Sequence, residues 1–435
     1  MSRFNRAGFR LFCLGTWLAF ILPATSSLAE TTLIHAGTLL AVPGERPERE
    51  KTIVIVDGKI LKVLDGFVGD DAYEGATIAD LREHFVMPGL MDMHVHLQGE
   101  LGPNNDRDDL KMSDELVAMR SLSFARKTLM AGFTTVRDVG SNPQSMYAMR
   151  DAINAGWVHG PRIIAAGGVG ITGGHADISG VKPDLMELYT RPTICDGPYD
   201  CRRATRHAIK FGADLIKITS TGGVLTDRAT GTGQQMEMDE LREVVLAAER
   251  MGRKVAAHAH AEAGIVAALE AGVHSIEHGT YTGADAIRLF KKTGAYLVPT
   301  LIAGDTVADM ARNADYMSPA IAEKAIRVGN DMAGNFGRAY KAGVKVAFGT
   351  DSGVSAHGNN AHEAVLMHAA GMPSAEILVA ATINAADLID RSDTLGTLEP
   401  GKHADIIAMP RSPLDDIAAL KEVDFVMKGG TVYKD

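Results

Sequence analysis

The sequence predicts an α/β fold, a (β/α)8 or TIM barrel with a small β-sandwich domain that is formed by both chain ends. Between residues 86 and 390, eight short apolar runs alternate with longer amphipathic stretches, as in parallel strands that are joined by helices. No glycine-rich phosphate turn follows the first run, which favours a closed barrel over an open doubly wound sheet. The two chain ends instead alternate apolar and polar residues between glycine turns.

Residues 1–29 have the layout of a cleavable secretory signal peptide. Three arginines precede the apolar block LFCLGTWLAFIL, and small residues lead up to Ala29. The alternative is a membrane anchor, but this block of 12 residues is shorter than the roughly 20 that span a bilayer. We therefore expect cleavage after Ala29, export to the periplasm or the medium, and no membrane attachment of the mature chain.

The β-sandwich domain is expected to combine residues 30–85 with residues 391–435. Near the start, TTLIHAGTLLAVPG and KTIVIVDGKILKVLDG have the alternation of short strands in a meander. Near the end, ADIIAMPRSPL and VDFVMKGGTVYKD show the same alternation of apolar and polar residues. One small sheet built from both ends would leave residues 86–390 to the barrel.

The barrel strands are expected at the eight apolar runs. In chain order these are GLMDMHVHL, FTTVRDVG, PRIIAAGGVG, ADLIKITSTGG, KVAAHAHA, HSIEHG, AYLVPT and VKVAFGTDSG. Helical stretches such as residues 238–252 and 262–272 separate most of them, and each ends at a glycine, as helices often do.

Composition limits the classes of function. The chain has 435 residues, of which 46% are hydrophobic and 23% charged, as in a soluble globular enzyme. The formal net charge is −10 and becomes −13 when the three arginines of residues 1–29 are removed. An acidic chain without a basic run has no footprint for phosphate, so we expect no nucleic-acid partner.

Two cysteines remain in the mature chain, Cys195 and Cys201, on either side of a Gly-Pro turn. In an exported protein such a pair can close a short disulfide. Two free thiols in a loop are the alternative, and the sequence leaves both open.

Potential metal ligands stand at the carboxyl ends of four runs, where (β/α)8 barrels carry their active sites. They are His94 and His96 in the first run, His258 and His260 in the fifth, His278 in the sixth and Asp351 in the eighth. His94 and His96 point to one face about 7 Å apart and can reach one ion. His274 lies about 13 Å nearer the barrel floor and is interpreted as structural. Core histidines and a capping aspartate are the alternatives, but their coincidence at four strand ends favours a metal site.

Lys217 lies inside the apolar fourth run, where an unpaired ammonium group would be costly. The side chain could extend its charge into the wet barrel mouth. Near two divalent cations, its neutral amine could instead take up carbon dioxide. The resulting carbamate would be an oxygen ligand able to bridge two metals.

Five motifs resemble the metal-binding strands of the amidohydrolase superfamily. They are VMPGLMDMHVHL, GADLIKITSTGG, VAAHAH, SIEHG and FGTDSG, and they occur in the family's order. The chain is most similar to the secreted branch of Xaa-Pro dipeptidase-like and carboxypeptidase-like enzymes and fungal ochratoxinase, and its first motif also resembles imidazolonepropionase. This resemblance extends over nearly the whole mature chain, including LGTLEPGKHADIIAM near its end.

The resemblance implies two divalent metal ions. Their ligands would be His94, His96, Lys217, His258, His278 and Asp351. Asp351 would join the histidines of the first run on the more buried ion, and a carboxylated Lys217 would bridge to the second. His258, rather than His260, would be the ligand from the fifth run. Nitrogen and oxygen ligands without cysteine favour Zn²⁺, with Mn²⁺, Co²⁺ and Fe²⁺ as alternatives.

Residues outside the ligand set remain for substrate binding. His175, His260 and Arg228, which lies in the glycine-rich loop 222–235, are the candidates. Either histidine could recognise a substrate carboxylate, whereas an exposed arginine is usually a solvated surface charge. Asp92 could orient a ligand histidine. Asp138 could support the site or simply pair with its surroundings.

The expected reaction is cleavage of a peptide-like amide C–N bond in a small molecule by a metal-bridging hydroxide, as in a dipeptidase, a carboxypeptidase or an N-acyl amino acid hydrolase. Asp351 would take up the proton and pass it to the leaving nitrogen. Hydrolysis of a cyclic amide is the alternative. Lys217 argues against the single-metal imidazolonepropionase type, and export argues against a dihydroorotase role. A non-catalytic scaffold is disfavoured by the complete ligand set. The sequence leaves the oligomeric state open, with a homo-oligomer among the alternatives.

Overall fold

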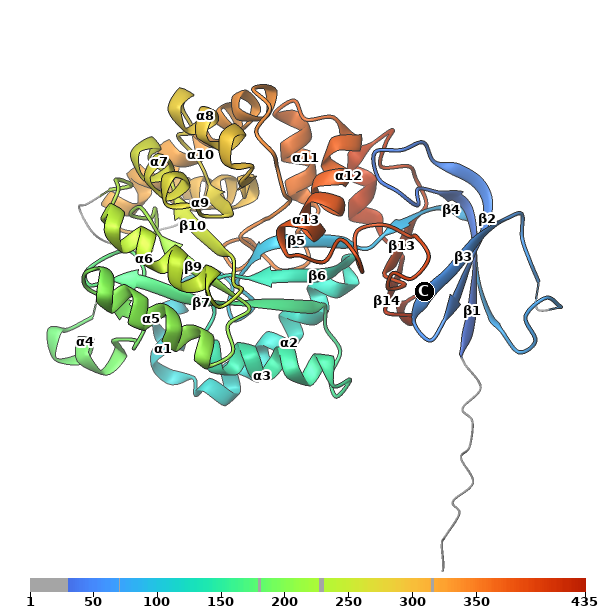
Figure 1. The fold of residues 1–435 in the computed structure, drawn as a ribbon, viewed down its shortest axis with the longest axis horizontal. Coiled ribbons are helices and arrows are strands. Elements are labelled where there is room, and N and C mark those ends of the chain that lie inside the picture. Colours follow the sequence, from blue (N-terminus) through green and yellow to red (C-terminus); the bar gives the residue numbers. More distant parts are fainter. Residues whose placement is uncertain (1–29, 70, 179–180, 227–230, 314–316) are drawn as a thin grey trace, which may run out of the picture.

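The computed structural model describes residues 30–435 except 70, 179–180, 227–230 and 314–316. The predicted signal peptide and Arg228 therefore lie outside the described residues. Figure 1 shows a barrel flanked by helices, with a smaller sheet beside it. In the described part of the chain, no helix has the length and apolar character that crossing a membrane requires.

Seven parallel strands of the larger sheet follow one another in chain order around the barrel. They are β5 (Leu90–Val95), β6 (Phe133–Asp138), β7 (Arg162–Ile171), β9 (Leu215–Thr219), β10 (Val255–Ala259), β11 (Ser275–His278) and β12 (Tyr296–Val298). Each coincides with one of the first seven apolar runs, so the predicted barrel is confirmed. The strands are almost entirely buried because helices cover their outer face.

The eighth run closes the barrel without forming a regular strand. On one side the Ala347 amide donates to the carbonyl of Leu297 in β12 at 3.0 Å. On the other, the amide of Met93 in β5 donates to the Phe348 carbonyl at 2.8 Å. The run then leaves the extended conformation, because Asp351 adopts a left-handed backbone with φ of 57°. The barrel is therefore closed, but its last strand is irregular where Asp351 enters the site.

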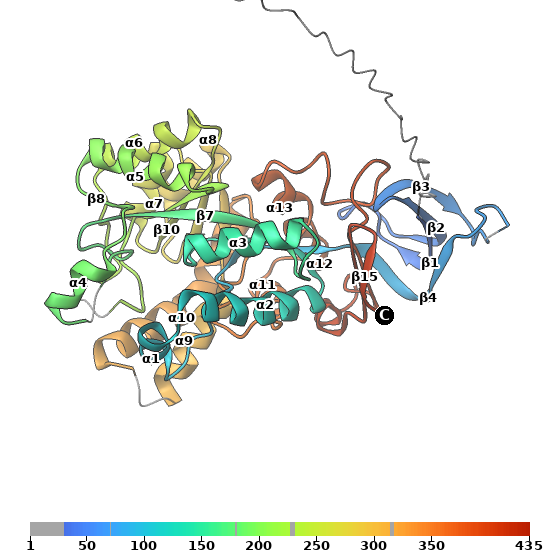
Figure 2. The same cartoon turned by 90° about the horizontal axis from the view of Figure 1, so that it is seen from below.

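Thirteen helices occur among the described residues, and most of them pack around the barrel (Figures 1 and 2). They are α1 (Asn105–Lys111), α2 (Asp114–Met130), α3 (Pro143–Asn154), α4 (Pro183–Tyr189), α5 (Pro198–Lys210), α6 (Met238–Glu249), α7 (Glu262–Ala271), α8 (Ala284–Thr293), α9 (Leu301–Asn313), α10 (Pro319–Lys341), α11 (His362–Ala369), α12 (Ser374–Ala380) and α13 (Ile383–Leu388). The helices predicted over 238–252 and 262–272 are α6 and α7. Helix α7 ends as expected, at Gly272 in the left-handed conformation.

The smaller sheet has seven strands drawn from both chain ends, as predicted. Its order is β15-β14-β13-β4-β1-β2-β3. The strands are β1 (Thr31–Leu39), β2 (Glu48–Val56), β3 (Lys59–Asp65), β4 (Thr77–Pro88), β13 (Ile406–Met409), β14 (Phe425–Lys428) and β15 (Thr431–Lys434), with a 3-10 turn η1 (Ile417–Glu422) between β13 and β14. Strand β4 joins the two groups of strands, and it runs past the expected boundary at residue 85 to Pro88.

The smaller sheet leads directly into the first barrel strand. Only Gly89 separates β4 from β5, and a Cβ atom at this position would lie 2.3 Å from the hydroxyl oxygen of Thr134. A partly buried ion pair of 2.8 Å between Arg162 of β7 and Asp405 adds a polar link between the barrel and the smaller sheet. The smaller sheet therefore anchors the strand that carries His94.

Cys195 and Cys201 form a disulfide, which resolves the alternative that the sequence leaves open. Both residues are buried. Cys195 belongs to the short strand β8 (Ile194–Cys195), which pairs with the end of β7 at Gly170 and Ile171. The bond to Cys201 in α5 fixes this edge segment beside the barrel mouth.

Candidate functional site

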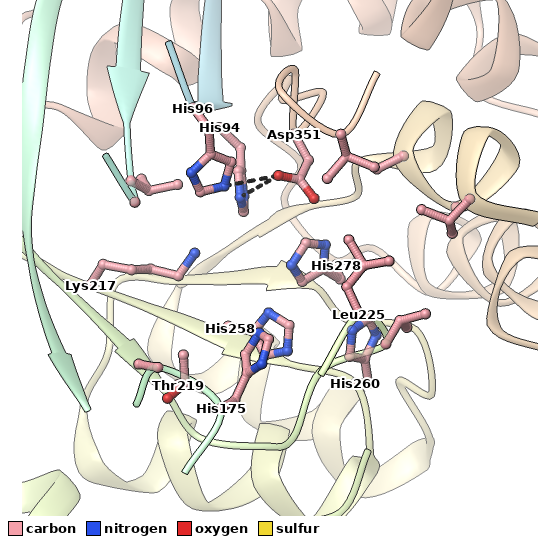
Figure 3. Close-up of a pocket in the computed structure, with 18 of the residues that line it drawn as sticks. His94, His96, His175, Lys217, Thr219, Leu225, His258, His260, His278 and Asp351 are labelled. Carbon is pink, nitrogen blue, oxygen red and sulfur yellow. Dashed lines mark ion pairs between the residues drawn. The ribbon is translucent and has the colours of Figure 1, made fainter. Parts of the chain in front are cut away.

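A pocket of ≈ 310 Å³ opens at the carboxyl ends of the barrel strands. Figure 3 shows that it gathers side chains from strands far apart in the sequence. All the sequence-predicted site residues that the structure describes line it: His94, His96, His175, Lys217, His258, His260, His278 and Asp351. Strand ends that are remote in the chain converge here because parallel strands of a barrel share one open face.

His94, His96 and Asp351 form the first potential metal group. Their ligand atoms all lie within 4.8 Å of one another. The Oδ1 atom of Asp351 is 2.9 Å from Nε2 of His96 and 3.4 Å from Nε2 of His94. Burial by itself would raise the pKa of Asp351, but the charges and hydrogen bonds of the two histidines hold this pKa well below its ordinary value. Asp351 is therefore a carboxylate at neutral pH.

Glu277 fixes the orientation of the His94 ring. Its Oε2 atom lies 2.8 Å from Nδ1 of His94, which must donate because a carboxylate only accepts. In the neutral ring, Nε2 then presents a lone pair toward the acceptor oxygen of Asp351. Two acceptors that face each other in a buried site require a cation or a proton between them, so this geometry fits a metal ion.

Arg137 holds Glu277 in place beneath the site. The two side chains are 2% and 0% exposed, and Nη2 of Arg137 lies 2.7 Å from Oε1 of Glu277. Arg137 also donates through Nε to the Met93 carbonyl at 2.6 Å, and through Nη1 to the Ser275 hydroxyl at 3.0 Å. Burial alone would raise the pKa of Glu277, but the Arg137 charge and the contact with His94 keep it below its ordinary range. Glu277 is therefore an ionised acceptor.

Replacement of Glu277 by Gln is expected to weaken metal binding by about 10- to 100-fold, because the amide no longer fixes the tautomer and orientation of His94. The measurement is a competition titration of zinc against a chelator, with circular dichroism as the check on folding. Glu270→Gln, at an exposed position of α7, is the matched control. A folded Glu277→Gln variant with wild-type zinc affinity would contradict this role.

His258, His260 and His278 form the second potential metal group, again with ligand atoms within 4.8 Å of one another. His278 and His260 turn Nδ1 toward the hydroxyls of Thr300 and Thr280, at 2.7 and 2.8 Å. Nε2 of His258 lies 3.3 Å from the Gly222 carbonyl, so it is the donor, and Nδ1 is left as the ligand atom. Because all three histidines lie this close, the choice of His258 over His260 as a ligand stays a prediction.

Three of the six non-glycine residues with positive φ in the described part of the chain lie at these strand ends. His278 has φ of 70°, Thr300 has 52° and Asp351 has 57°, all in the left-handed region that non-glycine residues rarely adopt. Such conformations persist where surrounding contacts enforce them, and they cluster at functional sites.

Lys217 extends its ammonium group toward the space between the two groups (Figure 3). The side chain is buried, and among the described residues it has no hydrogen bond and no ion pair. Burial lowers its pKa to about 8, which increases the fraction of neutral amine at pH 7. An unpaired buried lysine is the observation that a carbamate would explain.

The donor set as a whole fits divalent metal ions. It supplies imidazole nitrogens and a carboxylate oxygen, and the two cysteines of the described chain are committed to the disulfide. Such nitrogen and oxygen ligands suit Zn²⁺ and its first-row neighbours.

His175 lies in the pocket, as predicted, over the second group. Its ring centroid is 4.5 Å from that of His258, and Nδ1 makes a short hydrogen bond with the Thr226 hydroxyl. Burial, with the charge of Lys217, lowers its pKa to about 4, so its ring is neutral at pH 7.

Asp92 has a different role from the one considered from the sequence. Its Oδ1 atom accepts from the amides of His94 and Thr350, at 3.0 and 3.1 Å, and Oδ2 accepts from the Thr350 hydroxyl at 2.6 Å and from Asn360 at 2.8 Å. It therefore ties the first barrel strand to the eighth run, and it is Glu277 that orients the His94 ring.

Two other sequence interpretations agree with the structure. Asp138 pairs with its surroundings, accepting from the Leu97 amide at 2.8 Å and from the Ser141 hydroxyl at 2.7 Å. His274 is structural, because its Nδ1 accepts from the Val255 amide at 3.2 Å.

Sequence reasoning missed three charged residues at the site: Arg137, Glu277 and Arg191. The first two left a signal, because FTTVRDVG and SIEHG each carry a charge inside an apolar run and the charges are opposite. Arg191 lines the pocket but lies in a loop without a motif. Apolar residues also line the pocket, among them Val307 of α9 and Met332 of α10.

Comparisons with known proteins place this site among related enzymes. A sequence model of the amidohydrolase family matches residues 85–433. Ochratoxinase from Aspergillus niger is 32% identical over 436 residues, covering 94% of this chain and 88% of that protein. A solved structure of a Xaa-Pro dipeptidase, with methionine bound in the active site, is 41% identical with a TM-score of 0.89, covering 93% of this chain and 100% of that one.

Imidazolonepropionase from Caldanaerobacter subterraneus subsp. tengcongensis is 27% identical over 186 residues, which cover 41% of this chain and 39% of that protein. The matches to ochratoxinase and to the dipeptidase thus extend over nearly the whole described chain, whereas this one does not.

Proposed function

Because this chain belongs to the amidohydrolase family, it is a hydrolase of carbon–nitrogen amide bonds, and we propose that it cleaves a peptide-like amide whose leaving amino acid carries a free carboxylate. Dipeptides and N-acyl amino acids are the substrate classes. The similar Xaa-Pro dipeptidase has methionine, which has such a carboxylate, in its active site. The single observation that carries the proposal is the unpaired, buried Lys217 between two groups of metal-binding side chains.

The proposed site holds two divalent ions, with Zn²⁺ favoured. His94, His96 and Asp351 would hold one, and His258 and His278 the other, with a carbamate on Lys217 as the bridging ligand. Divalent ions in such a site acidify water to a pKa of about 7 and polarise the amide carbonyl. The carbamate would form if the neutral Lys217 amine bonded to the carbon of carbon dioxide and released one proton. The lowered pKa of Lys217 supports this step.

Asp351 is the proposed proton carrier. As a carboxylate it takes the proton that the attacking water loses when the new C–O bond forms. It then gives this proton to the nitrogen as the C–N bond breaks, so the products are a carboxylic acid and an amine. Its position at the end of the eighth run, beside both histidines of β5, supports this role.

The proposal includes export of the mature chain through residues 1–29. The Cys195–Cys201 disulfide supports it, because disulfides persist mainly in oxidising compartments.

The direct test is an assay of the zinc-loaded mature protein against dipeptides and N-acyl amino acids that differ in the C-terminal residue. Cyclic imides and lactones form a second panel. Release of a free amino acid from the first panel supports the proposal. Turnover of the second panel alone favours the cyclic-amide alternative, and activity on neither favours a non-catalytic scaffold.

Removal of metal is expected to abolish this activity, because the proposed nucleophile depends on it. Dialysis against a chelator should lower turnover to background, and added Zn²⁺ should restore it, while circular dichroism shows an unchanged fold. Full turnover in protein that elemental analysis shows to be free of metal would contradict a metal-dependent reaction.

A further inference from the structure

The segment of residues 190–195, here called the strap, follows α4 and includes strand β8 at the edge of the pocket. It carries Arg191, which lines the pocket wall. We propose that Arg191 binds the carboxylate of the substrate and that the disulfide holds the strap in position for it. This inference rests on the proposed function and names the residue that recognises that substrate class.

The strap is fixed at several points around Arg191. The Thr172 amide donates to the Cys195 carbonyl at 3.0 Å, and the Gly170 amide donates to the Thr193 carbonyl at 3.3 Å. From the other side, the guanidinium of Arg203 donates to the Pro192 carbonyl at 2.7 Å. The Cys195–Cys201 bond adds a covalent link to α5. The strap is therefore held against the end of β7, directly before the loop that carries His175.

Arg191 is available to a ligand. Its side chain is exposed, and its guanidinium makes no hydrogen bond or ion pair with any residue that the structure describes, whereas its backbone carbonyl accepts from the Ile194 amide at 3.0 Å. Its neighbour Arg203 is instead engaged, both with Asp200 at 2.5 Å and with the strap itself. Arg191 therefore differs from Arg203, because its guanidinium is free to bind a ligand in the pocket.

The charges of the pocket leave one position for an anion. Among the lining residues the cations are Lys217 and Arg191, and the single carboxylate is Asp351. Lys217 and Asp351 belong to the proposed metal centre, so Arg191 is the cation that remains. A guanidinium matches a carboxylate with two parallel hydrogen bonds, which strengthens and orients the contact.

The two histidines considered from the sequence are less suited to this task. The Nδ1 atoms of His175 and His260 already face the hydroxyls of Thr226 and Thr280. Each ring therefore has at most one nitrogen free, whereas Arg191 offers its whole donor fork. The assignment of the carboxylate accordingly moves from these histidines to Arg191.

The test compares Arg191→Met with wild type on an N-acyl amino acid and on its carboxamide, both cleaved at the same bond. For the carboxylate substrate, KM is expected to rise roughly 10- to 100-fold, the range for hydrogen bonds to a charged group, while kcat changes little. For the carboxamide, KM should stay the same. Arg191→Lys should restore part of the loss. Arg206→Met, on the exposed face of α5, is the matched control.

An unchanged KM for the carboxylate substrate in Arg191→Met, or an equal rise for both substrates, would overturn the proposal. If wild type cleaves neither substrate, the proposed function fails, and Arg191 is tested by calorimetric binding of the same two compounds to the zinc-loaded protein. Tighter binding of the carboxylate that Arg191→Met removes then supports Arg191. Equal binding of the two compounds, or no binding of either, overturns it.

The disulfide is tested with the double variant Cys195→Ser, Cys201→Ser. It should raise KM for the carboxylate substrate more than for the carboxamide, because a looser strap misplaces the guanidinium. If KM for the carboxylate substrate is the same in the double variant and in wild type, the disulfide does not position Arg191. The Arg191 variants still decide whether Arg191 binds the carboxylate.

Discussion

Lys217→Ala is expected to lose bound metal and activity together. Zinc should fall from two ions per chain to one or none, because the proposed bridging ligand between the two groups of potential metal ligands is removed. The value of kcat/KM should fall by roughly 10³-fold or more, the scale on which loss of a complete catalytic group acts. The truncated side chain should not unfold the protein, because removing a buried, unpaired ammonium removes a desolvation cost.

The measurement combines elemental analysis with steady-state kinetics on the same preparation. Lys292→Ala, at an exposed position of α8, is the matched control. Two zinc ions per chain and normal turnover in Lys217→Ala would exclude a carbamate at this position. Mass spectrometry of the native holoprotein, with a gain of the mass of carbon dioxide in wild type but not in the variant, provides an independent readout.

Asp351→Asn is expected to lower kcat by about 10²- to 10⁴-fold, because the amide cannot carry a proton from water to the leaving nitrogen. The fold should survive, since asparagine is among the few residues that tolerate the left-handed backbone found at this position. KM should change less than kcat, because in the proposed reaction Asp351 acts on the reacting atoms rather than on a remote part of the substrate.

The measurement is the steady-state kcat and KM of purified Asp351→Asn that has been loaded with zinc to the wild-type level. Asp415→Asn, an exposed residue of the smaller body, controls for loss of a carboxylate elsewhere. A rate near that of wild type would leave the proton transfer to another group. Loss of zinc that reloading cannot restore would assign Asp351 a binding role alone.

The sequence predicted most of the fold because two periodicities are visible in it. Alternation marks the strands of the smaller sheet, and short apolar runs mark the buried parallel strands of the barrel. The irregular eighth run escaped prediction. Its hydrogen bonds to β5 and β12 and the left-handed Asp351 depend on packing around the closed barrel, which the local pattern does not encode.

The two groups of potential metal ligands could be predicted for a topological reason: parallel strands bring their carboxyl ends to one face. The support of His94 by Glu277 and Arg137 was not predicted, because a charge inside an apolar run does not by itself reveal its partner. These two residues come from β6 and β11, which are not neighbours in the sheet, and meet through the barrel interior. Arg191 escaped for a different reason, since a disulfide and a short strand pair, rather than a motif, place it.

The left-handed residues at the barrel mouth imply a trade-off between thermal stability and activity. His278, Thr300 and Asp351 each hold a backbone that costs of order 1–3 kcal/mol in a non-glycine residue. Glycine would adopt the same backbone without that cost, yet it would remove a proposed metal ligand, the hydroxyl that contacts one, or the proposed proton carrier. Selection for a higher melting temperature alone would therefore tend to replace these three residues. Variants selected for thermal stability should be assayed for turnover at every step.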